Sequence, residues 1–593
     1  MNLKSWNEVW KLAKINVKIN GVLIEVESGT RIIEAAKSLN IEIPHLCYHP
    51  DQRIKALCRI CSVEVVGSKK MSAACSTYVW DGMEILTNTK KVYDTQKGIL
   101  EMILANHKQD CLSCSRNGNC ELQNLCMRFG IQRQTLDKTV NPVYLDDNPC
   151  IERNMDKCVK CGRCDKICRD VQGVSAITWA GRSETFTFTT AYNKSLMDTD
   201  CVLCGQCTTV CPVGAIVEKD NTQTVREAIQ DSGKHVIVQV APAVRVALGD
   251  IFELEKGTVV TGKMVTALKQ LGFDKVFDTV FAADVTIMEE GNELLDRIRN
   301  NGILPMITSC SPGWVNYMEK HYSDQIDHLS TAKSPQQIFG AIAKSYYADK
   351  SNMNKKNIIT VSVMPCVTKK FEAARPEMAN DGVRDVDIVI TTRELAKMIQ
   401  YAGIDFVALE ESEFDSPLGE GTGAGVIFGT TGGVTEAAVR TVYEVVMEDE
   451  LEKLEFKDAR GLQGIKEAEV DLKGRKLKIA VAHGLANAQK IMEQIKAGTS
   501  PYTFIEIMAC PGGCIGGGGQ PLNTTIDGKK MRMDAIYEID CSKKIRKSHE
   551  NPEVQKLYRE FLGKPLSEKS HELLHTHYHK ANKRYDFSYL DES

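Results

Sequence analysis

The second half of the chain alternates short apolar runs with helical patterns. Apolar runs of strand length lie at 235–241, 275–284, 303–309, 358–364, 387–391, 478–484 and 504–508. Helical patterns of apolar residues lie between them, at 264–273, 285–300, 392–403 and 485–498. Such alternation is typical of a mostly parallel sheet with helices on both faces. We therefore predict one large α/β domain over residues 223–540.

The two ends of the chain have weaker patterns. Residues 1–14 predict an amphipathic basic helix with Trp6, Val9, Trp10 and Ala13 on one face. This helix either packs on the next domain or docks to a partner subunit. Strand signals at 15–21 and 22–28 and a helix at 30–40 follow, so the chain is α/β and α+β multidomain. Residues 541–593 are polar and helical and predict a wrap over the surface.

Composition narrows the class of protein. The chain has 593 residues, enough for several domains, and no apolar run of membrane-spanning length. Its start lacks the pattern of a secretory signal, so we expect a cytoplasmic protein. The net charge of −4, with acids and bases interspersed, argues against a nucleic-acid partner. Its 22 cysteines stand in closely spaced sets, which predicts metal ligands rather than disulfides.

Three apolar runs end at cysteines where a loop begins. Cys310 ends the first, Cys366 the second, and Cys510 and Cys514 the third, where a run of four glycines follows. Ligands bind at the carboxyl ends of strands in open α/β sheets, and glycines let the backbone approach a bulky group. We therefore predict that these thiols meet at a single buried inorganic site.

The same three segments carry a resemblance to a known family. The sequences TSCSPGW, MPCVTKKFE and CPGGCIGGGGQP resemble the three signature segments of the FeFe-hydrogenases. The resemblance implies an H-cluster, a 4Fe–4S cube joined to a two-iron unit with CO, cyanide and a bridging dithiolate. It gives Cys366, Cys510 and Cys514 to the cube, with Cys514 as the bridge, and Lys369 to a hydrogen bond with a cyanide. The implied pocket wall comprises Pro242, Met364, Met508, Gln336 and Phe428.

The resemblance also implies a proton path. Its members would be Cys310, Glu290, Ser330, Glu293 and Arg297. Helical spacing supports part of it, since Glu290, Glu293 and Arg297 fall at i, i+3 and i+7 on one face. Without the family match, a solvated charged face is the simpler interpretation of these three residues.

Two positions depart from the family pattern. The family usually has two adjacent cysteines in the first segment, a proton relay and then a cube ligand, whereas this chain has Cys310 and Ser311. Either Ser311 binds iron through oxygen, or Cys310 becomes the ligand, or the fourth iron takes another ligand. Oxygen is a harder donor than sulfur and would alter the cube's potential. In addition, Ala243 stands where many members have a serine beside a cyanide.

The N-terminal half contains two further cysteine patterns. Residues 15–90 hold a C-x10-C-x2-C-x13-C set, similar to the 2Fe–2S module of many hydrogenases and of the large iron–sulfur subunit of complex I. Residues 91–140 hold an H-x3-C-x2-C-x5-C set, similar to the one-histidine 4Fe–4S module of the same two families. Imidazole in place of thiolate removes a negative charge and raises the potential. The proposed ligands are Cys47, Cys58, Cys61 and Cys75 in the first set and His107, Cys111, Cys114 and Cys120 in the second.

Residues 141–222 hold two C-x2-C-x2-C-x3-C runs, the pattern of two-cluster bacterial ferredoxins. In that pattern the fourth cysteine of each run binds the other cluster. Zinc ribbons would explain the C-x2-C pairs but not the doubled run. Cys126, Cys150 and Cys541 fit no pattern and are predicted to be structural. The spacing predicts one 4Fe–4S cluster on Cys158, Cys161, Cys164 and Cys211 and a second on Cys201, Cys204, Cys207 and Cys168.

These modules together predict an enzyme that interconverts H2 with protons and electrons. One 2Fe–2S and three 4Fe–4S clusters would relay electrons to the H-cluster. No dinucleotide motif is evident, and the glycine-rich stretch 419–433 fits a close-packed loop near the metal better than a nucleotide loop. The long relay resembles catalytic subunits of electron-bifurcating NAD(P)-linked complexes, with flavin-binding and iron–sulfur partner subunits. The alternatives are a stand-alone ferredoxin-linked hydrogenase, a respiratory electron-transfer subunit, and an H2 sensor or cluster-assembly scaffold.

Overall fold

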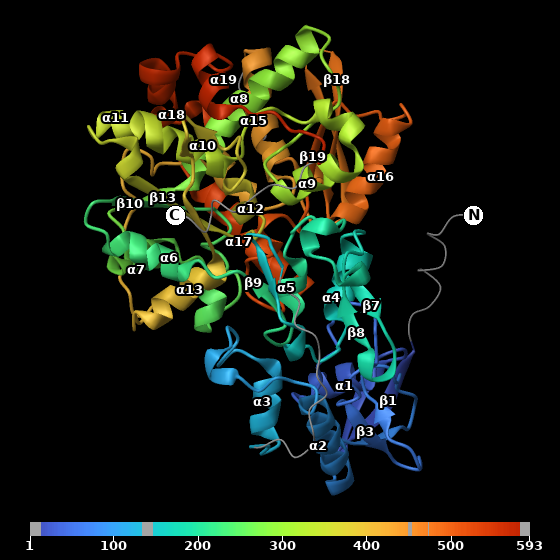
Figure 1. Ribbon diagram of the computed structural model, residues 1–593. Helices are drawn as coiled ribbons and strands as arrows, with labels where there is room; N and C mark the ends of the chain where they lie inside the picture. Colours follow the sequence, from blue (N-terminus) through green and yellow to red (C-terminus); the bar gives the residue numbers. More distant parts are fainter. Residues whose placement is uncertain (1–12, 133–145, 449–453, 473, 582–593) are drawn as a thin grey trace.

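A computed structural model describes residues 13–132, 146–448, 454–472 and 474–581 (Figure 1). The predicted helix at 1–14 therefore lies almost wholly outside the described residues, and Lys14 already belongs to the first strand. Figure 1 shows the N-terminal modules, in blue and cyan, extending from one end of a larger body that holds the rest of the chain. Every helix in the described part of the chain is too short or too polar to cross a lipid bilayer.

The first module is a five-stranded sheet with one helix. The strand order is β2-β1-β5-β3-β4, with β1 parallel to β5 and the other neighbouring pairs antiparallel. The predicted strands at 15–21 and 22–28 and the helix at 30–40 are confirmed. The elements are β1 Lys14–Ile19, β2 Val22–Glu27, α1 Ile32–Ser38, β3 Ser62–Val65, β4 Ser72–Ala73 and β5 Glu84–Leu86.

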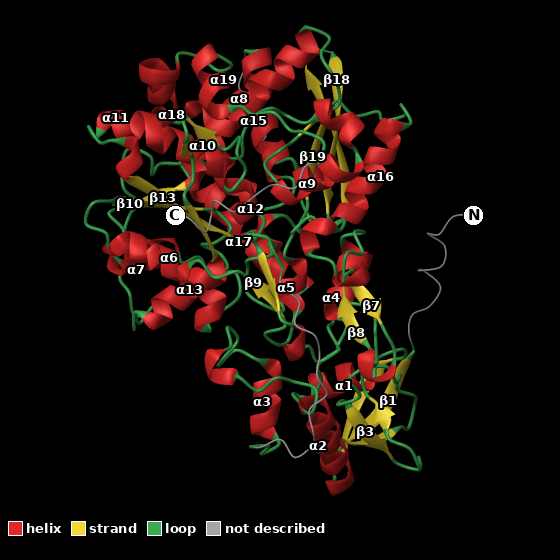
Figure 2. Ribbon diagram, viewed as in Figure 1, coloured by secondary structure: helices red, strands yellow, loops and turns green. Residues whose placement is uncertain are grey.

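Two small modules link this sheet to the catalytic body. The first is helical, and the second has two short hairpin-like pairs of strands, β6 with β9 and β7 with β8. Figure 2 shows the β7–β8 pair and α4 between the first sheet and the main body. The elements are α2 Lys90–Leu104, α3 Glu121–Arg128, β6 Ile151–Arg153, α4 Arg163–Lys166, β7 Thr178–Ala180, β8 Thr187–Thr189, α5 Gln206–Val210 and β9 Ile216–Glu218.

The catalytic body contains two four-stranded sheets where the sequence predicted one. The first is wholly parallel, in the order β11-β10-β13-β16, and the second, β12-β19-β18-β17, is parallel except for the β17–β18 pair. Alternation of strands and helices cannot reveal where a sheet divides, because each sheet separately satisfies the pattern. The strands are β10 His235–Val240, β11 Lys275–Asp278, β12 Met306–Ile307, β13 Ile358–Met364, β16 Ile388–Thr391, β17 Ile465–Leu472, β18 Arg475–His483 and β19 Phe504–Met508.

Helices cover these sheets and connect their strands. Helices α8, α10 and α12 carry residues that the sequence singled out as candidate site residues, and Ser311 directly precedes α9. The strands β14 Ala379–Asn380 and β15 Val383–Arg384 form a small separate ribbon. The helices are α6 Thr222–Gln230, α7 Thr261–Leu271, α8 Thr279–Arg299, α9 Pro312–His321, α10 Pro335–Ile342, α11 Ala348–Lys350, α12 Lys369–Ala373, α13 Thr392–Tyr401, α14 Gly423–Val426, α15 Gly433–Met447, α16 Leu485–Lys496, α17 Ile526–Ser542, α18 Pro552–Leu557 and α19 Glu568–Leu574.

Helix α8 begins earlier than the sequence predicted. The predicted strand at 275–284 is correct only for β11, and the helix already starts at Thr279. The Asp278 carboxylate caps it by accepting the Val280 N–H, and the residues that follow are buried on every side. The first turn of α8 is mostly apolar, and periodicity cannot distinguish such a turn from a buried strand. The signal that the sequence analysis missed was Asp278, which is a favoured residue at a helix N-cap.

The glycine-rich stretch 419–433 is only partly the predicted loop, because residues 423–429 and 433 are helical. It forms α14, one 3-10 turn at Ile427–Gly429 and the start of α15. Its close packing is as predicted: a Cβ on Gly421 would lie 2.2 Å from Val280, and one on Gly423 would lie 2.1 Å from Asp540. The small residues therefore let α14 lie directly against α8 and α17.

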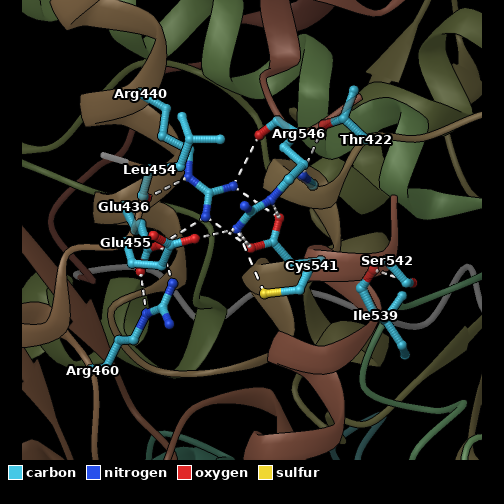
Figure 3. Close-up of polar contacts among 12 residues, drawn as sticks. Thr422, Glu436, Arg440, Leu454, Glu455, Arg460, Ile539, Cys541, Ser542 and Arg546 are labelled. Carbon is cyan, nitrogen blue, oxygen red and sulfur yellow. Dashed lines mark hydrogen bonds and ion pairs between the residues drawn. The ribbon is translucent and has the colours of Figure 1, made fainter. Parts of the chain in front are cut away.

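A buried ion network fastens α15 to α17 (Figure 3). Arg440 is fully buried and donates to both Asp540 carboxylate oxygens, at 2.9 and 2.8 Å, and to Glu436 at 2.7 Å. Arg460 also donates to Glu436, and Arg546 to Asp540. Each buried charge thus has partners of opposite sign, the condition under which burying ions is tolerated. The α17 helix held in this way follows directly from the glycine loop at 511–519.

Candidate metal centre

The thiols predicted to meet do line one cavity, of about 80 Å³. They come from both sheets: Cys310 follows β12, Cys366 follows β13, and Cys510 follows β19. The carboxyl ends of the two sheets therefore face the same space. The remaining cavity wall includes Ser311, Cys514, Lys369, Pro242, Met364, Met508, Gln336 and Phe428.

The thiols influence one another strongly. Burial, followed by the charges of Cys366 and Cys514, raises the pKa of Cys510, and burial with Cys366 raises the pKa of Cys514 to about 12. A cluster of buried thiols that disfavour each other's ionisation is the donor set that iron would stabilise as thiolates. Glycine makes room here: a Cβ on Gly517 would lie 2.1 Å from the Pro365 carbonyl oxygen.

Cys310 and Ser311 lie on different sides of this group. Burial and then Glu290 raise the pKa of Cys310 well above its usual value, with Cys514 a further contributor. The Ser311 hydroxyl instead accepts the Ala509 N–H at 3.2 Å, next to Cys510. The Cys310 thiol therefore faces the carboxylate of α8, and the Ser311 oxygen lies beside the loop with the other cysteines.

Lys369 is fully engaged by protein groups. Its ammonium donates to Glu372 at 2.8 Å, to the Ser334 hydroxyl at 2.7 Å and to the Cys310 carbonyl oxygen at 3.2 Å. These partners use three N–H donors, so a donor to a bound group would have to leave one of them. The Gln336 carbonyl oxygen, by contrast, is buried with no partner among the described residues, and it lines the same cavity.

Three of the five predicted relay residues are joined directly by hydrogen bonds. Glu293 accepts from the Ser330 hydroxyl at 2.8 Å and from Arg297 at 2.6 Å. Arg297 is half-buried and forms the outer end. Glu290 lies between this group and Cys310, and neither of its oxygens has a hydrogen-bond partner at bonding distance among the described residues.

The Glu290 carboxyl has a strongly shifted pKa. Burial is the main cause, the charge of Glu293 is the second, and together they raise the pKa to about 8. The Ser330 side chain and the Ser309 backbone act in the opposite direction and lower the pKa, but burial and Glu293 outweigh them. A buried carboxyl with a pKa near neutrality can both accept and release a proton at physiological pH.

The structure also shows neighbours that sequence reasoning missed. Glu506 is fully buried beside the site, and its carboxylate accepts the N–H groups of Gly432 and Thr435 at the start of α15. Glu372 holds Lys369 at one end. Glu506 lies inside the apolar strand β19, where no local pattern singles it out. Glu372 lies in the short helix α12, and the only signal for it was its place at the end of the MPCVTKKFE segment.

The first N-terminal set is brought together as predicted. The thiols lie so close that hydrogen bonds from Cys58 and Cys75 lower the pKa of Cys47, while Cys75 lowers that of Cys61. The same contacts raise the pKa values of Cys58 and Cys75. Four buried sulfurs that share protons in this way fit a single small cluster.

The second set includes a buried histidine that contacts a backbone carbonyl. His107 is buried, and its Nδ1 lies 3.0 Å from the Lys157 carbonyl oxygen. A metal-binding histidine commonly donates its other ring N–H to a backbone carbonyl in this way. Cys111 is exposed and Cys114 and Cys120 are partly so. Cys126, predicted to be a core thiol, lies near them, since burial and then Cys120 and Cys111 raise its pKa to about 11.

The crossed ferredoxin pairing agrees with the geometry. Besides burial, Cys211 raises the pKa values of Cys158 and Cys161, which precede it by about fifty residues. Cys168 acts in the same way on Cys201 and Cys207. The fourth cysteine of each run thus lies near at least two of the first three cysteines of the other run.

The order of the sets in space differs from their order in the sequence. Lys55 lies near both Cys47 and Cys161, and Arg116 of the histidine module donates to the Cys211 carbonyl oxygen at 3.4 Å. Both N-terminal modules therefore adjoin the Cys158 set. At the other end, burial and then Cys510 raise the pKa of Cys204, which places the Cys201 set next to the central cavity.

Family models match the chain from end to end. They are a 2Fe–2S iron–sulfur cluster binding domain at 13–90, the NADH-ubiquinone oxidoreductase-G iron–sulfur binding region at 96–135, and the ferredoxin-like domain of NADH-quinone oxidoreductase subunit 3 at 148–217. The C-terminal domain of the iron-only hydrogenase large subunit matches 234–518, and the iron hydrogenase small subunit matches 527–581.

Whole-chain relatives agree with these models. The NADP-reducing hydrogenase subunit HndD of Solidesulfovibrio fructosivorans is 48% identical over 96% of this chain and 100% of its own length. Iron hydrogenase 1 of Clostridium pasteurianum is 44% identical over 95% of this chain and 99% of its own. The solved apo FeFe-hydrogenase HydA1 of Chlamydomonas reinhardtii is 42% identical, with a TM-score of 0.55, over 62% of this chain and 100% of its own.

Proposed function

This chain belongs to the iron-only, or FeFe, hydrogenases, and from that premise we propose that it is the catalytic subunit of a multimeric NAD(P)-linked hydrogenase. The enzyme interconverts H2 with protons and electrons. The observation that carries the proposal is the meeting of four cysteines at one cavity, with Glu290 close to Cys310 and the Cys201 set adjoining the cavity. We propose domains at 15–90, 91–140 and 141–222 for the N-terminal iron–sulfur modules. The catalytic domain would span 223–540, and the C-terminal wrap would span 541–593.

The residues at the cavity fit an H-cluster. Cys366, Cys510 and Cys514 would hold the cube, and the methionines, Pro242 and Phe428 would keep water from the two-iron unit. The unpartnered Gln336 oxygen fits a site that is completed by a bound group. When bound, the group supplies an open iron at which H2 is formed or split.

The chain's own contribution is to move protons. Burial keeps the Glu290 carboxyl protonated below about pH 8, so that it can donate toward Cys310 and be reprotonated from the Glu293 side. Ser330 donates to Glu293 and lies close to Glu290, and Arg297 also donates to Glu293 from the outer end of the path. The steps require only small movements along one face of α8.

We assign the thiol of the relay to Cys310 and the fourth cube position to Ser311. Cys310 lies toward Glu290, whereas the Ser311 oxygen lies beside the Cys510 loop. Replacing the oxygen by sulfur in S311C should shift the potential of the cube, because thiolate is a softer donor than oxygen. A redox titration of the cube by electron paramagnetic resonance measures this shift, and an unchanged potential would show that Ser311 does not bind iron. The matched control, S309C, changes a neighbouring buried serine whose hydroxyl instead donates to the Ala332 carbonyl oxygen.

Electrons would pass through one 2Fe–2S and three 4Fe–4S clusters held by the N-terminal sets. The exposed Cys111, followed by the almost fully exposed Leu112, offers an entry point for a flavin-binding or iron–sulfur partner subunit in the cytoplasm. HndD is by name a subunit of an NADP-reducing enzyme, which favours an electron-bifurcating complex over a stand-alone ferredoxin-linked enzyme.

Affinity purification from the native host tests this proposal. We expect flavoprotein subunits to co-elute and the complex to couple H2 oxidation to reduction of NAD(P) together with ferredoxin. A fully active lone chain that uses only ferredoxin would refute the complex. Hydrogen evolution from reduced methyl viologen, with infrared bands of bound CO and cyanide, separates an enzyme from a sensor or scaffold.

A further inference from the structure

The Glu293 carboxylate is held mainly from a loop outside its own helix. Ser330 donates its hydroxyl to one oxygen at 2.8 Å, and the Thr331 N–H donates to both, at 3.2 and 3.1 Å. The position of this carboxylate in the proposed relay therefore depends on where residues 330 and 331 are fixed.

A segment from the far C-terminus fixes that loop. Residues 574–576, at the end of α19 and just after it, pair with 331–333 through an antiparallel bridge between Ala332 and His575. The Thr576 N–H donates to the Thr331 carbonyl oxygen, and the Lys333 N–H donates to the Leu574 carbonyl oxygen, each at 2.8 Å. The C-terminal segment thus forms one edge of the relay's supporting loop.

His575 adds a side-chain link across this pair of strands. It is 8% exposed, with Nδ1 2.8 Å from the Thr331 hydroxyl and Nε2 3.1 Å from a Glu289 oxygen. Burial alone would raise the pKa of Glu289, but hydrogen bonds from His575, Tyr558 and the Leu566 N–H outweigh it and lower the pKa. The ionised Glu289 carboxylate accepts a hydrogen bond from the His575 Nε2–H, and Nδ1 then accepts a hydrogen bond from the Thr331 hydroxyl.

We infer that His575 is a positioning residue for the proton relay: oriented by Glu289, it holds Thr331 so that the Thr331 N–H and the Ser330 hydroxyl stay on Glu293. The inference rests on the proposed relay through Glu293. It assigns a role in proton transfer to the C-terminal segment, which is 282 residues distant in sequence from the carboxylate that it serves. His575 touches no reacting atom, so its effect is on the geometry of the hydrogen bonds.

The test uses the matured full-length enzyme and variants of both partners. H575A and T331V should each slow H2 evolution from reduced methyl viologen about tenfold and increase the solvent deuterium isotope effect, because proton transfer becomes slower than the other steps. The KM for methyl viologen and the infrared bands of bound CO and cyanide should be unchanged. H575N, whose amide can stand where Nδ1 stands, should recover most of the rate, and H577A, at a neighbouring exposed histidine, should match the wild type.

The outcomes separate the two proposals. Wild-type rates and isotope effects in both H575A and T331V, alongside a slow E293Q, would overturn the inference and leave the relay intact. A wild-type E293Q would overturn the relay and the inference together. If H575A loses its infrared bands through misfolding, T331V decides, because it removes only the hydroxyl and leaves the strand pairing in place.

Discussion

Replacing Glu290 by glutamine should make the protein more stable, and increasingly so as the pH rises. The wild-type carboxyl has a pKa of about 8 in the folded state against an ordinary value of 4.5, with burial as the main cause. The folded state therefore holds its proton over a pH range in which the unfolded chain has already lost it, and stability falls as the pH rises through that range. Glutamine has nearly the same shape and does not titrate.

The magnitude follows from the size of the shift. At about 1.4 kcal/mol per pKa unit, the wild type loses about 4 kcal/mol of unfolding free energy between pH 5 and 9 that E290Q keeps. With an unfolding entropy of about 2 cal/mol/K per residue over roughly 320 residues, this is about 6 °C in Tm. Calorimetric scans of both proteins at one scan rate and several pH values measure the widening gap.

A variant of the preceding residue, Glu289, is a control in which the change in stability should have the opposite sign. Glu289 has a lowered pKa because hydrogen bonds outweigh its burial, so it stabilises the protein above its ordinary pKa and loses that effect as the pH falls. E289Q should therefore be less stable than the wild type near neutrality, with a gap that closes in acid. Parallel wild-type and E290Q curves from pH 5 to 9 would refute the assigned pKa and with it the neutral Glu290 of the proposed relay. In the same preparation, H2 evolution by E290Q should fall at least about 100-fold.

Other parts of the structure give further predictions. R440M should cost about 3–5 kcal/mol, seen as a lower Tm, because it leaves Asp540 and Glu436 buried with fewer partners, whereas K476M at the exposed Lys476–Glu469 pair should cost almost nothing. G517A should reduce the iron bound at the central cavity, since its Cβ would lie 2.1 Å from the Pro365 carbonyl oxygen; G98A, which meets nothing within 4 Å, should keep full iron content in elemental analysis. H107C should lower the potential of its cluster in a redox titration followed by electron paramagnetic resonance, and an unchanged potential would mean that His107 is not a ligand.

The chemistry of the site was more predictable from the sequence than its architecture. Ligand spacing is local, so the nearness of Cys168 and Cys211 to the opposite runs and the position of Cys310 at a strand end followed from short motifs. The helical spacing of Glu290, Glu293 and Arg297 likewise survived in α8. These features depend on neighbours within a few turns of chain.

Long-range relationships were not predictable in the same way. The division of the strands into two sheets, the early start of α8 and the helical part of 419–433 depend on packing between distant segments. Nothing in the local pattern of the C-terminal segment indicates that His575 meets Thr331 and Glu289, because those partners lie more than 200 residues away. Tertiary contacts override weak local preferences at such places.

Both N-terminal modules adjoin the Cys158 set, so this set is a shared junction between them and the rest of the proposed relay. In the proposed relay, each module would accept electrons from its own donor, and electrons from either donor would cross the Cys158 set before they reach the Cys201 set. Oxidative damage at that junction would disconnect both donors at once, while damage to one outer module would leave the other in service. The proposed arrangement thus allows two electron donors, but both depend on the Cys158 set.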